Sequence, residues 1–241
     1  MRSIVMTAGC SGCGTAAVTA AVARQLALQG KKVLLVEATA GLRRMNRLLE
    51  IREEGLFDFS DLLEGRCALE NALLPTHIAG LTLLQGPSAI DWVPEAADVQ
   101  LLREELSGTE QYDALLWYCP PGAGALQKGL LPAAETLVLL TKVTPQSIEA
   151  AAKTADWWAG QGARNLRTVF NRVGRRLPRD LGYPHLDAVL DAIGARLLGM
   201  IPEGAPPPVI LPPACAEKAA RCWPFTGRKI HLDLNIAKGG T

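Results

Sequence analysis

Residues 3–17 read S-I-V-M-T-A-G-C-S-G-C-G-T-A-A, and this stretch decides the fold. It begins with a short apolar run that is typical of a buried strand, and an alanine-rich helical pattern follows over residues 15–29. Between them, Gly9, Gly12 and Gly14 permit backbone conformations that other residues avoid. A strand, a glycine-rich loop and a helix in this order predict a loop at the carboxyl end of a parallel strand, where α/β proteins bind ligands.

Apolar runs and helical patterns alternate along the rest of the chain. The run V-L-L-V-E at residues 33–37 shows no polar alternation, as expected for a strand that is buried on both faces of a parallel sheet. Further strands are predicted at residues 81–84, 114–118, 136–141, 166–171 and 197–201, and helices at 42–49, 95–106, 145–158 and 186–193. We therefore predict an α/β fold, a single doubly wound and mostly parallel sheet of at least seven strands with helices on both faces. This domain covers residues 1–205, and residues 206–241 form a proline-rich extension that packs on it or trails from it.

Composition and charge narrow the class of partner. The chain has 241 residues, and its 25 Lys and Arg against 24 Asp and Glu give no overall bias toward nucleic acid or an anionic membrane. No apolar run reaches the roughly 18 residues of a membrane helix, and the first apolar stretch is too short for a signal peptide. Near the end, Ile230, Leu232, Leu234 and Ile236 alternate with polar residues, which is a strand period. We expect a cytoplasmic protein without a membrane helix and without a nucleic-acid partner.

The glycine-rich loop fits only part of a phosphate-binding pattern. In G-x-x-x-x-G-K-[ST], Gly9 and Gly14 match, but Thr15 replaces the lysine and Ala16 replaces the hydroxyl that ligates Mg²⁺. The backbone path that surrounds a phosphate with N–H groups is still allowed. The candidate binding residues in the loop are Gly9, Ser11, Gly12, Gly14 and Thr15. The alternative interpretation is a strand-turn-helix that has glycines but binds no nucleotide.

Five segments in order resemble the MinD/ParA family of deviant Walker A ATPases. Residues 7–17, T-A-G-C-S-G-C-G-T-A-A, resemble that family's T-S-G-K-G-G-V-G-K-T-T, with Cys10 at the signature lysine. The other segments are V-L-L-V-E-A-T-A-G-L-R-R-M-N, Q-Y-D-A-L-L-W-Y-C-P-P-G, F-N-R-V and L-L-G-M-I-P-E, which begin at residues 33, 111, 170 and 197. The resemblance covers roughly residues 1–205 and implies a P-loop fold of the MinD type.

The same resemblance implies a degenerate nucleotide site. Glu37 and Thr39 stand at the family's two aspartates after the second strand, Tyr118 stands at the Walker B aspartate, and Asn171 keeps the adenine-contacting asparagine. We expect ATP or ADP binding to be weak or absent, without hydrolysis. The implied function is a binding or regulatory protein of the cell-division or positioning type, a homodimer through the P-loop face with an unidentified protein partner. An ATPase with unorthodox residues is a further alternative.

Cys10 and Cys13 form a C-x-x-C pair inside the loop. Because proteins of the MinD type dimerise with their P-loops facing each other, two loops would bring four cysteines together. Such a set could hold a [4Fe–4S] cluster or another metal for electron transfer or sensing. Thiol redox chemistry and incidental cysteines remain open alternatives. Cys119 could add a third ligand or fill space at a strand end.

Overall fold

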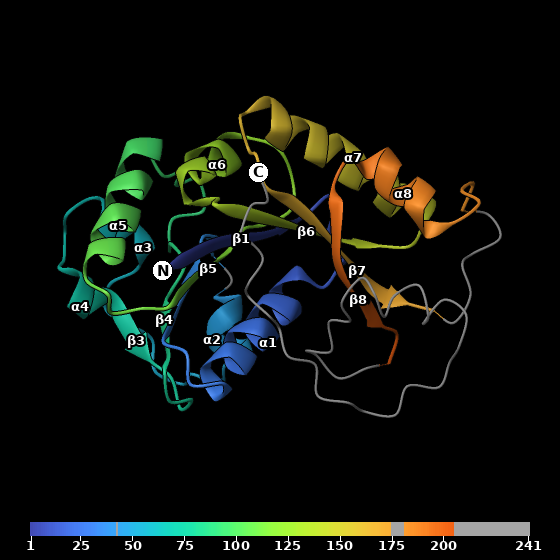
Figure 1. The fold of residues 1–241 in the computed structure, drawn as a ribbon. Helices are drawn as coiled ribbons and strands as arrows, with labels where there is room; N and C mark the ends of the chain where they lie inside the picture. Colours follow the sequence, from blue (N-terminus) through green and yellow to red (C-terminus); the bar gives the residue numbers. More distant parts are fainter. Residues whose placement is uncertain (42, 175–180, 205–241) are drawn as a thin grey trace.

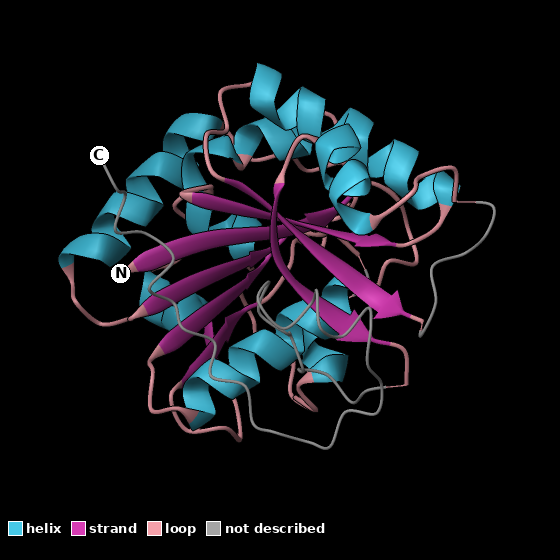
Figure 2. Cartoon of the chain, turned by 45° about the vertical axis from the view of Figure 1, so that its right-hand side comes forward, coloured by secondary structure: helices cyan, strands magenta, loops and turns pink. Residues whose placement is uncertain are grey.

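The computed structural model of the protein describes residues 1–41, 43–174 and 181–204, and these residues form one eight-stranded sheet. Its strand order is β3-β4-β2-β5-β1-β6-β7-β8, and every neighbouring pair is parallel except β3 and β4. Helices cover both faces of the sheet (Figure 1 and Figure 2). The predicted doubly wound, mostly parallel α/β fold is confirmed.

The strands are β1 (Arg2–Ala8), β2 (Val33–Glu37), β3 (Leu73–Pro75), β4 (Leu81–Leu84), β5 (Ala114–Tyr118), β6 (Thr136–Lys142), β7 (Leu166–Val173) and β8 (Arg196–Pro202). The helices are α1 (Thr15–Leu28), α2 (Arg44–Leu48), α3 (Phe59–Leu63), α4 (Leu69–Ala72), α5 (Ala96–Gly108), α6 (Ala125–Gly129), α7 (Pro145–Gly160) and α8 (Leu186–Ile193), with a 3₁₀ turn, η1 (Leu131–Ala133).

The core consists of two layers of apolar side chains, one on each face of the sheet. Under α1 and α2, side chains such as Leu26, Leu35 and Leu116 pack together. On the opposite face, Trp117 and Trp158 belong to the layer that packs beneath α3, α5 and α7. All five residues of β2 and of β5 are buried, which explains their continuous apolar sequences.

Helix α7 is important for the site because it begins next to the glycine-rich loop. Its first residue, Pro145, suits the first turn of a helix, where an N–H group would have no intrahelical partner. The Thr144 side chain caps the helix by accepting a hydrogen bond from the Ser147 backbone N–H. The first turn of α7 is therefore fixed close to the end of β6.

Several predicted boundaries agree with the structure, and the differences have local causes. Strands β2, β4 and β5 and helix α8 have the predicted bounds. Strand β3 was not predicted, because three residues that end in a proline carry too little apolar pattern. The extension at residues 206–241 and its alternating stretch lie outside the described residues. Within the described ranges, no helix is long and apolar enough to cross a membrane.

Candidate functional site at the carboxyl ends of the parallel strands

The glycine-rich loop lies where the sequence predicts it, between the end of β1 at Ala8 and the start of α1 at Thr15. Gly12 and Gly14 have φ angles of 78° and 83°, in the left-handed region that favours glycine. Gly14 is also the N-cap residue of α1. Because glycine has no side chain, it cannot accept a hydrogen bond from the first backbone N–H groups of that helix through a side chain.

Two contacts hold the loop from opposite sides. A Cβ atom at Gly9 would overlap the backbone of Ala150 and Ala151, so the loop packs directly against the main chain of α7. On the other side, the Asn171 amide Nδ2 of β7 donates a hydrogen bond of 2.7 Å to the Cys13 carbonyl oxygen. The same amide nitrogen occupies the space where a Cβ on Gly14 would lie. The amide of Asn171, the predicted adenine contact, is thus bonded to the loop itself.

The two loop cysteines are in contact with each other. The Sγ atoms of Cys10 and Cys13 lie 3.5 Å apart, and the Cys10 Sγ lies 3.6 Å from the Ser147 Oγ of α7. Cys10 is half-buried, whereas the Cys13 side chain is 1% exposed and packs in the layer beneath α1. The spacing and the glycine at position 12 therefore place both sulfur atoms on the same side of the turn.

Lys142, the last residue of β6, is a cation beside the loop that the sequence analysis missed. Its Nζ lies 3.8 Å from the position that a Cβ on Gly12 would take. Burial and contact with Cys10 raise the pKa of the Cys13 thiol, while Lys142 opposes this through its charge and a backbone hydrogen bond. The pairing of β1 with β6 brings Lys142 to the loop. Its position could therefore be predicted only from the order of the strands in the sheet, and not from a local sequence motif.

The ends of β2 and β5 hold a buried carboxyl group. Glu37 is 0% exposed, and its two carboxylate oxygens accept hydrogen bonds from the backbone N–H groups of Arg44 (2.8 Å) and Met45 (3.2 Å). Burial raises its pKa to about 7, and these two hydrogen bonds act in the opposite direction. The carboxyl group at the family's first aspartate position therefore caps the short helix α2.

The other substituted positions gather around the same edge. Tyr118 is buried at the end of β5, directly opposite Glu37 in the parallel register, and burial raises the pKa of its phenol. Thr39 follows β2, Thr15 is buried at the start of α1, and Ser11 is exposed at the loop tip. These residues thus lie at one edge of the sheet, and Thr15, Thr39 and Tyr118 carry hydroxyl groups at positions where the family that the sequence resembles has charged side chains.

Cys119 is separated from the loop cysteines by the sheet. Its side chain is fully buried in the layer on the α5 and α7 face, and burial raises its pKa to about 12. Across the described ranges there is no group of three or more His, Cys, Asp or Glu residues that could hold a metal ion. The structure favours the space-filling interpretation of Cys119. A cluster bound by Cys10 and Cys13 would need ligands from a second chain, and it stays a prediction.

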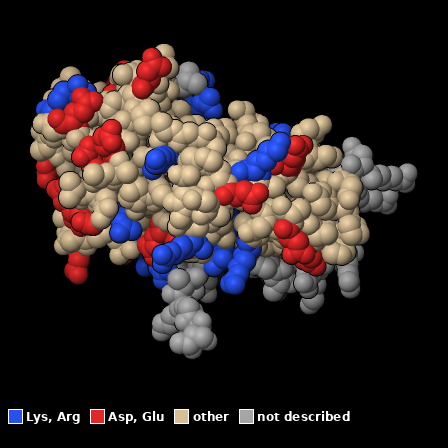
Figure 3. Space-filling view, turned by 90° about the horizontal axis from the view of Figure 1, so that it is seen from above, with Lys and Arg blue, Asp and Glu red and all other residues tan. Residues whose placement is uncertain are grey.

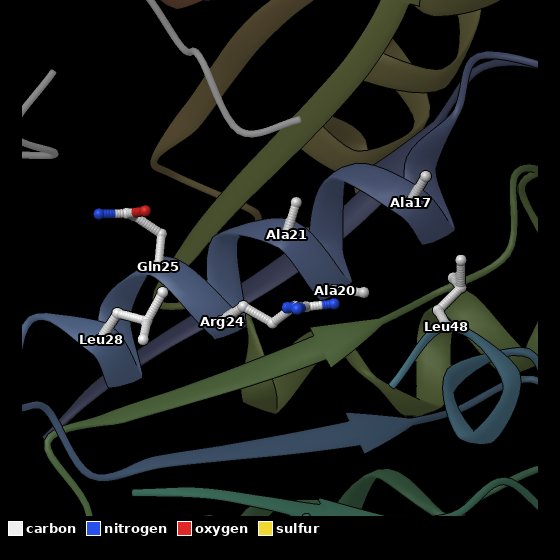
Figure 4. A pocket seen from close by; sticks show the side chains of 7 residues that line it. All are labelled: Ala17, Ala20, Ala21, Arg24, Gln25, Leu28 and Leu48. Atoms are coloured by element: carbon white, nitrogen blue, oxygen red, sulfur yellow. The ribbon is translucent and has the colours of Figure 1, made fainter. Parts of the chain in front are cut away.

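A surface hollow of about 450 Å³ lies along α1, away from this edge (Figure 4). It is lined by Ala17, Ala20, Ala21, Arg24, Gln25, Leu28 and Leu48. None of these residues belongs to the loop or to the strand ends, so the hollow is separate from the candidate site. On the face shown in Figure 3, acidic and basic side chains are interspersed, as the near-balanced composition leads one to expect.

Comparison of sequences gives relatives that share most of this chain. The putative septum site-determining protein MinD of Oltmannsiellopsis viridis is 29% identical over 204 residues, which are 84% of this chain and 64% of that protein. The septum site-determining protein MinD of Synechocystis is 25% identical over 206 residues, 84% of this chain and 76% of that protein. The chain thus spans about two thirds to three quarters of the length of these relatives. No family model matches the chain.

Comparison of structures agrees. The structure of the MinC:MinD cell division protein complex from Aquifex aeolicus superposes with a TM-score of 0.72 at 26% identity, over 92% of this chain and 86% of that chain. An apo McdA structure from Cyanthece also gives 0.72 over 92% of this chain and 90% of that chain. At 15% identity, the likeness to McdA shows a shared fold alone.

Proposed function

The chain belongs to the MinD/ParA family, and from this premise we propose that it is a binding or regulatory protein whose nucleotide site does not hydrolyse ATP. The family supports a role in cell division or in a related positioning system. In this chain, such a role would be carried out by a site whose side chains differ from those of the family pattern. It rests on the groups that surround the glycine-rich loop.

The observation that carries the proposal is the state of Glu37. Phosphoryl transfer needs positioned cations and a carboxylate that can reach Mg²⁺ or the attacking water. The Glu37 carboxylate is fully buried, and both its oxygens accept backbone hydrogen bonds from α2. The residue beside Glu37 on the adjacent strand β5 is Tyr118, and its phenol cannot act as a carboxylate. The residues present therefore do not fit Mg²⁺·ATP.

The loop itself supports the same conclusion for nucleotide affinity. Thr15 and Ala16 supply neither the lysine nor the Mg²⁺-binding hydroxyl of the P-loop pattern. The Asn171 amide, which the resemblance assigns to adenine, donates to the Cys13 carbonyl oxygen instead. We expect ATP and ADP to bind weakly or not at all. The Lys142 Nζ lies beside Gly12, but it comes from β6 and not from the lysine position of the P-loop pattern.

Without turnover, the protein would act through its surfaces. In the Aquifex aeolicus structure, MinD is in a complex with MinC. We propose that this chain likewise binds a protein partner, and that it forms a homodimer through the loop face. Because no nucleotide would be needed to complete the site, the dimerisation of the protein should not depend on ATP.

Two measurements on the purified full chain test this proposal. We expect phosphate release from Mg²⁺·ATP at the background rate and a sedimentation coefficient that does not change when ATP is added. Gly14→Val is the matched control, because Gly14 has a positive φ and its Cβ space is filled by Asn171. Turnover in the wild-type chain that disappears in Gly14→Val would refute the non-hydrolysing assignment. ATP-dependent dimerisation would refute the nucleotide-independent association.

A further inference from the structure

The Cys10–Cys13 pair has a geometry that goes beyond the proposed function. The Sγ–Sγ distance is 3.5 Å, and a disulfide bond requires about 2.05 Å, so the two sulfur atoms need to approach by only about 1.5 Å. Both residues lie in one turn, and Gly12 between them has a φ of 78° and open space around it apart from Lys142. This turn can adjust while the ends of the loop stay fixed.

The fixed ends make the contact a property of the packed loop. Gly9 lies against the α7 backbone, and the Cys13 carbonyl oxygen accepts the hydrogen bond from Asn171. These two contacts hold the backbone on either side of the cysteine pair. Movement is therefore confined to residues 10–13, and the sulfur atoms remain neighbours in the folded chain.

The two thiols differ in access, which gives each a distinct part in thiol–disulfide exchange. Cys10 is half-buried and can be reached by a small molecule, whereas Cys13 is 1% exposed. In exchange reactions, an accessible cysteine attacks first and a neighbouring cysteine resolves the mixed disulfide. The charge of Lys142 partly offsets the burial that raises the pKa of the Cys13 thiol, and so favours its thiolate in the second step.

We propose that Cys10 and Cys13 are a redox modification site, which low-molecular-weight disulfides convert into an intramolecular disulfide. The Cys10 thiolate attacks one sulfur of RSSR, forms Cys10–S–S–R and releases RS⁻, which takes up a proton. The Cys13 thiolate, after giving its proton to solvent, attacks the Cys10 sulfur and displaces the second RS⁻. Two electrons pass from the cysteines to the small disulfide, and the net products are one protein disulfide and two RSH molecules.

Peptide mapping of the full chain tests this proposal. Trypsin cleaves after Arg2 and Arg24, so residues 3–24 form one peptide that contains Cys10 and Cys13 and no other cysteine. The folded protein is incubated with oxidised glutathione, unfolded, alkylated and digested. We expect this peptide to be lighter by two hydrogen atoms and to resist alkylation until a reductant is added. Cys119, in a separate tryptic peptide, should be alkylated in full only after unfolding.

Two single variants test the order of the steps. In Cys13→Ser, the resolving thiol is missing, and we expect glutathione to remain attached to Cys10. In Cys10→Ser, only the buried thiol remains, and we expect modification at least about tenfold slower than in the wild type. Circular dichroism of both variants shows whether the fold is retained. Equal modification of the two single variants would overturn the assignment of an attacking and a resolving cysteine.

Other outcomes in the wild-type chain would overturn the proposal itself. These are a stable glutathione adduct without closure, a cross-link from residues 3–24 to another cysteine peptide, or two free thiols after incubation. Thiols that react only after a chelator removes iron or zinc would also overturn it, and would support the shared metal site instead. Metal and sulfide analysis of anaerobically purified protein identifies that last case.

Discussion

The glycine-rich loop and the ends of β2 and β5 lie next to each other on one edge of the sheet, but different forces hold them. The loop is fixed by main-chain contacts: Gly9 against the α7 backbone and the Cys13 carbonyl oxygen against Asn171. The neighbouring strand ends are fixed by a side chain, the Glu37 carboxyl group that caps α2. The backbone of the loop is thus held independently of the side chains at the neighbouring strand ends.

The largest effect on stability is expected from a Cβ atom at Gly9, which would disrupt the main-chain contact that holds the loop. Gly9→Ala places a methyl group on the backbone of Ala150 and Ala151, so α7 or the loop must move. We expect the free energy of unfolding, measured with urea, to fall by about 3 kcal/mol. Gly160→Ala in the same helix is the control, because nothing lies within 4 Å of its Cβ position. Similar stability of the two variants would show that the loop is not held by this contact.

The pH dependence of stability tests the side-chain side of the comparison. The folded Glu37 carboxyl keeps its proton up to a pKa of about 7, whereas the unfolded chain releases it near 4.5. The folded state binds more protons between these values, so this contribution is full below pH 4.5 and is lost as the pH rises through 7. We expect it to lower the free energy of unfolding by about 2 kcal/mol between pH 5 and pH 8.

Glu37→Gln removes the ionisation and should flatten that part of the pH profile, as measured by urea unfolding at several pH values. Glu149→Gln is the control, because Glu149 is an exposed carboxyl group on α7 that pairs with Lys153. The profile of this control should match the wild type. A wild-type slope retained in Glu37→Gln would mean that another group titrates in this range.

A smaller effect is expected where the loop depends on one side chain. Asn171→Ala removes the donor to the Cys13 carbonyl oxygen and leaves that buried acceptor unpaired. We expect a loss of about 1–2 kcal/mol in thermal or urea unfolding. Asn165→Ala, which breaks a 2.7 Å hydrogen bond to Thr136 at the opposite end of β7, is the comparison and should cost less because its surroundings are more exposed. A larger loss of stability in Asn165→Ala than in Asn171→Ala would show that the hydrogen bond at the loop is the weaker of the two.

The smallest effect concerns the cation at the loop. Lys142→Met removes the charge that lowers the pKa of the Cys13 thiol, so less thiolate is available to close the disulfide. We expect the mixed disulfide on Cys10 to decay about two- to threefold more slowly, as followed by mass spectrometry. Lys128→Met, at an exposed position of α6, should leave the rate unchanged. An unchanged rate in Lys142→Met would show that this charge does not act on Cys13.

Much of the fold was accessible from local patterns. Strand β2 could be predicted residue by residue, because its four apolar residues and Glu37 are all buried between two layers of helices. Helix α3 escaped prediction: its capping box uses Asp58 and Asp61, and five residues give too short a helical period. The position of the glycine-rich loop was predicted because Gly12 and Gly14 adopt the left-handed backbone that favours glycine.

The contacts of the site were less accessible. The bond from Asn171 to Cys13 joins residues 158 positions apart, and Lys142 reaches the loop only because β6 pairs with β1. The role of Glu37 as a helix cap depends on how the chain turns after β2, which the sequence pattern does not encode locally. Long-range pairing, rather than residue type, decided these features.

The short strand β3 has a consequence for how this protein behaves at high concentration. It pairs antiparallel with β4 and ends in Pro75, opposite Thr82. Without it, the N–H and C=O groups of the apolar strand β4 would form an open edge on which another chain could add a strand. Three residues, the last of them a proline without an N–H group, make a poor template. At this edge of the sheet, β3 therefore opposes the addition of a strand from another chain.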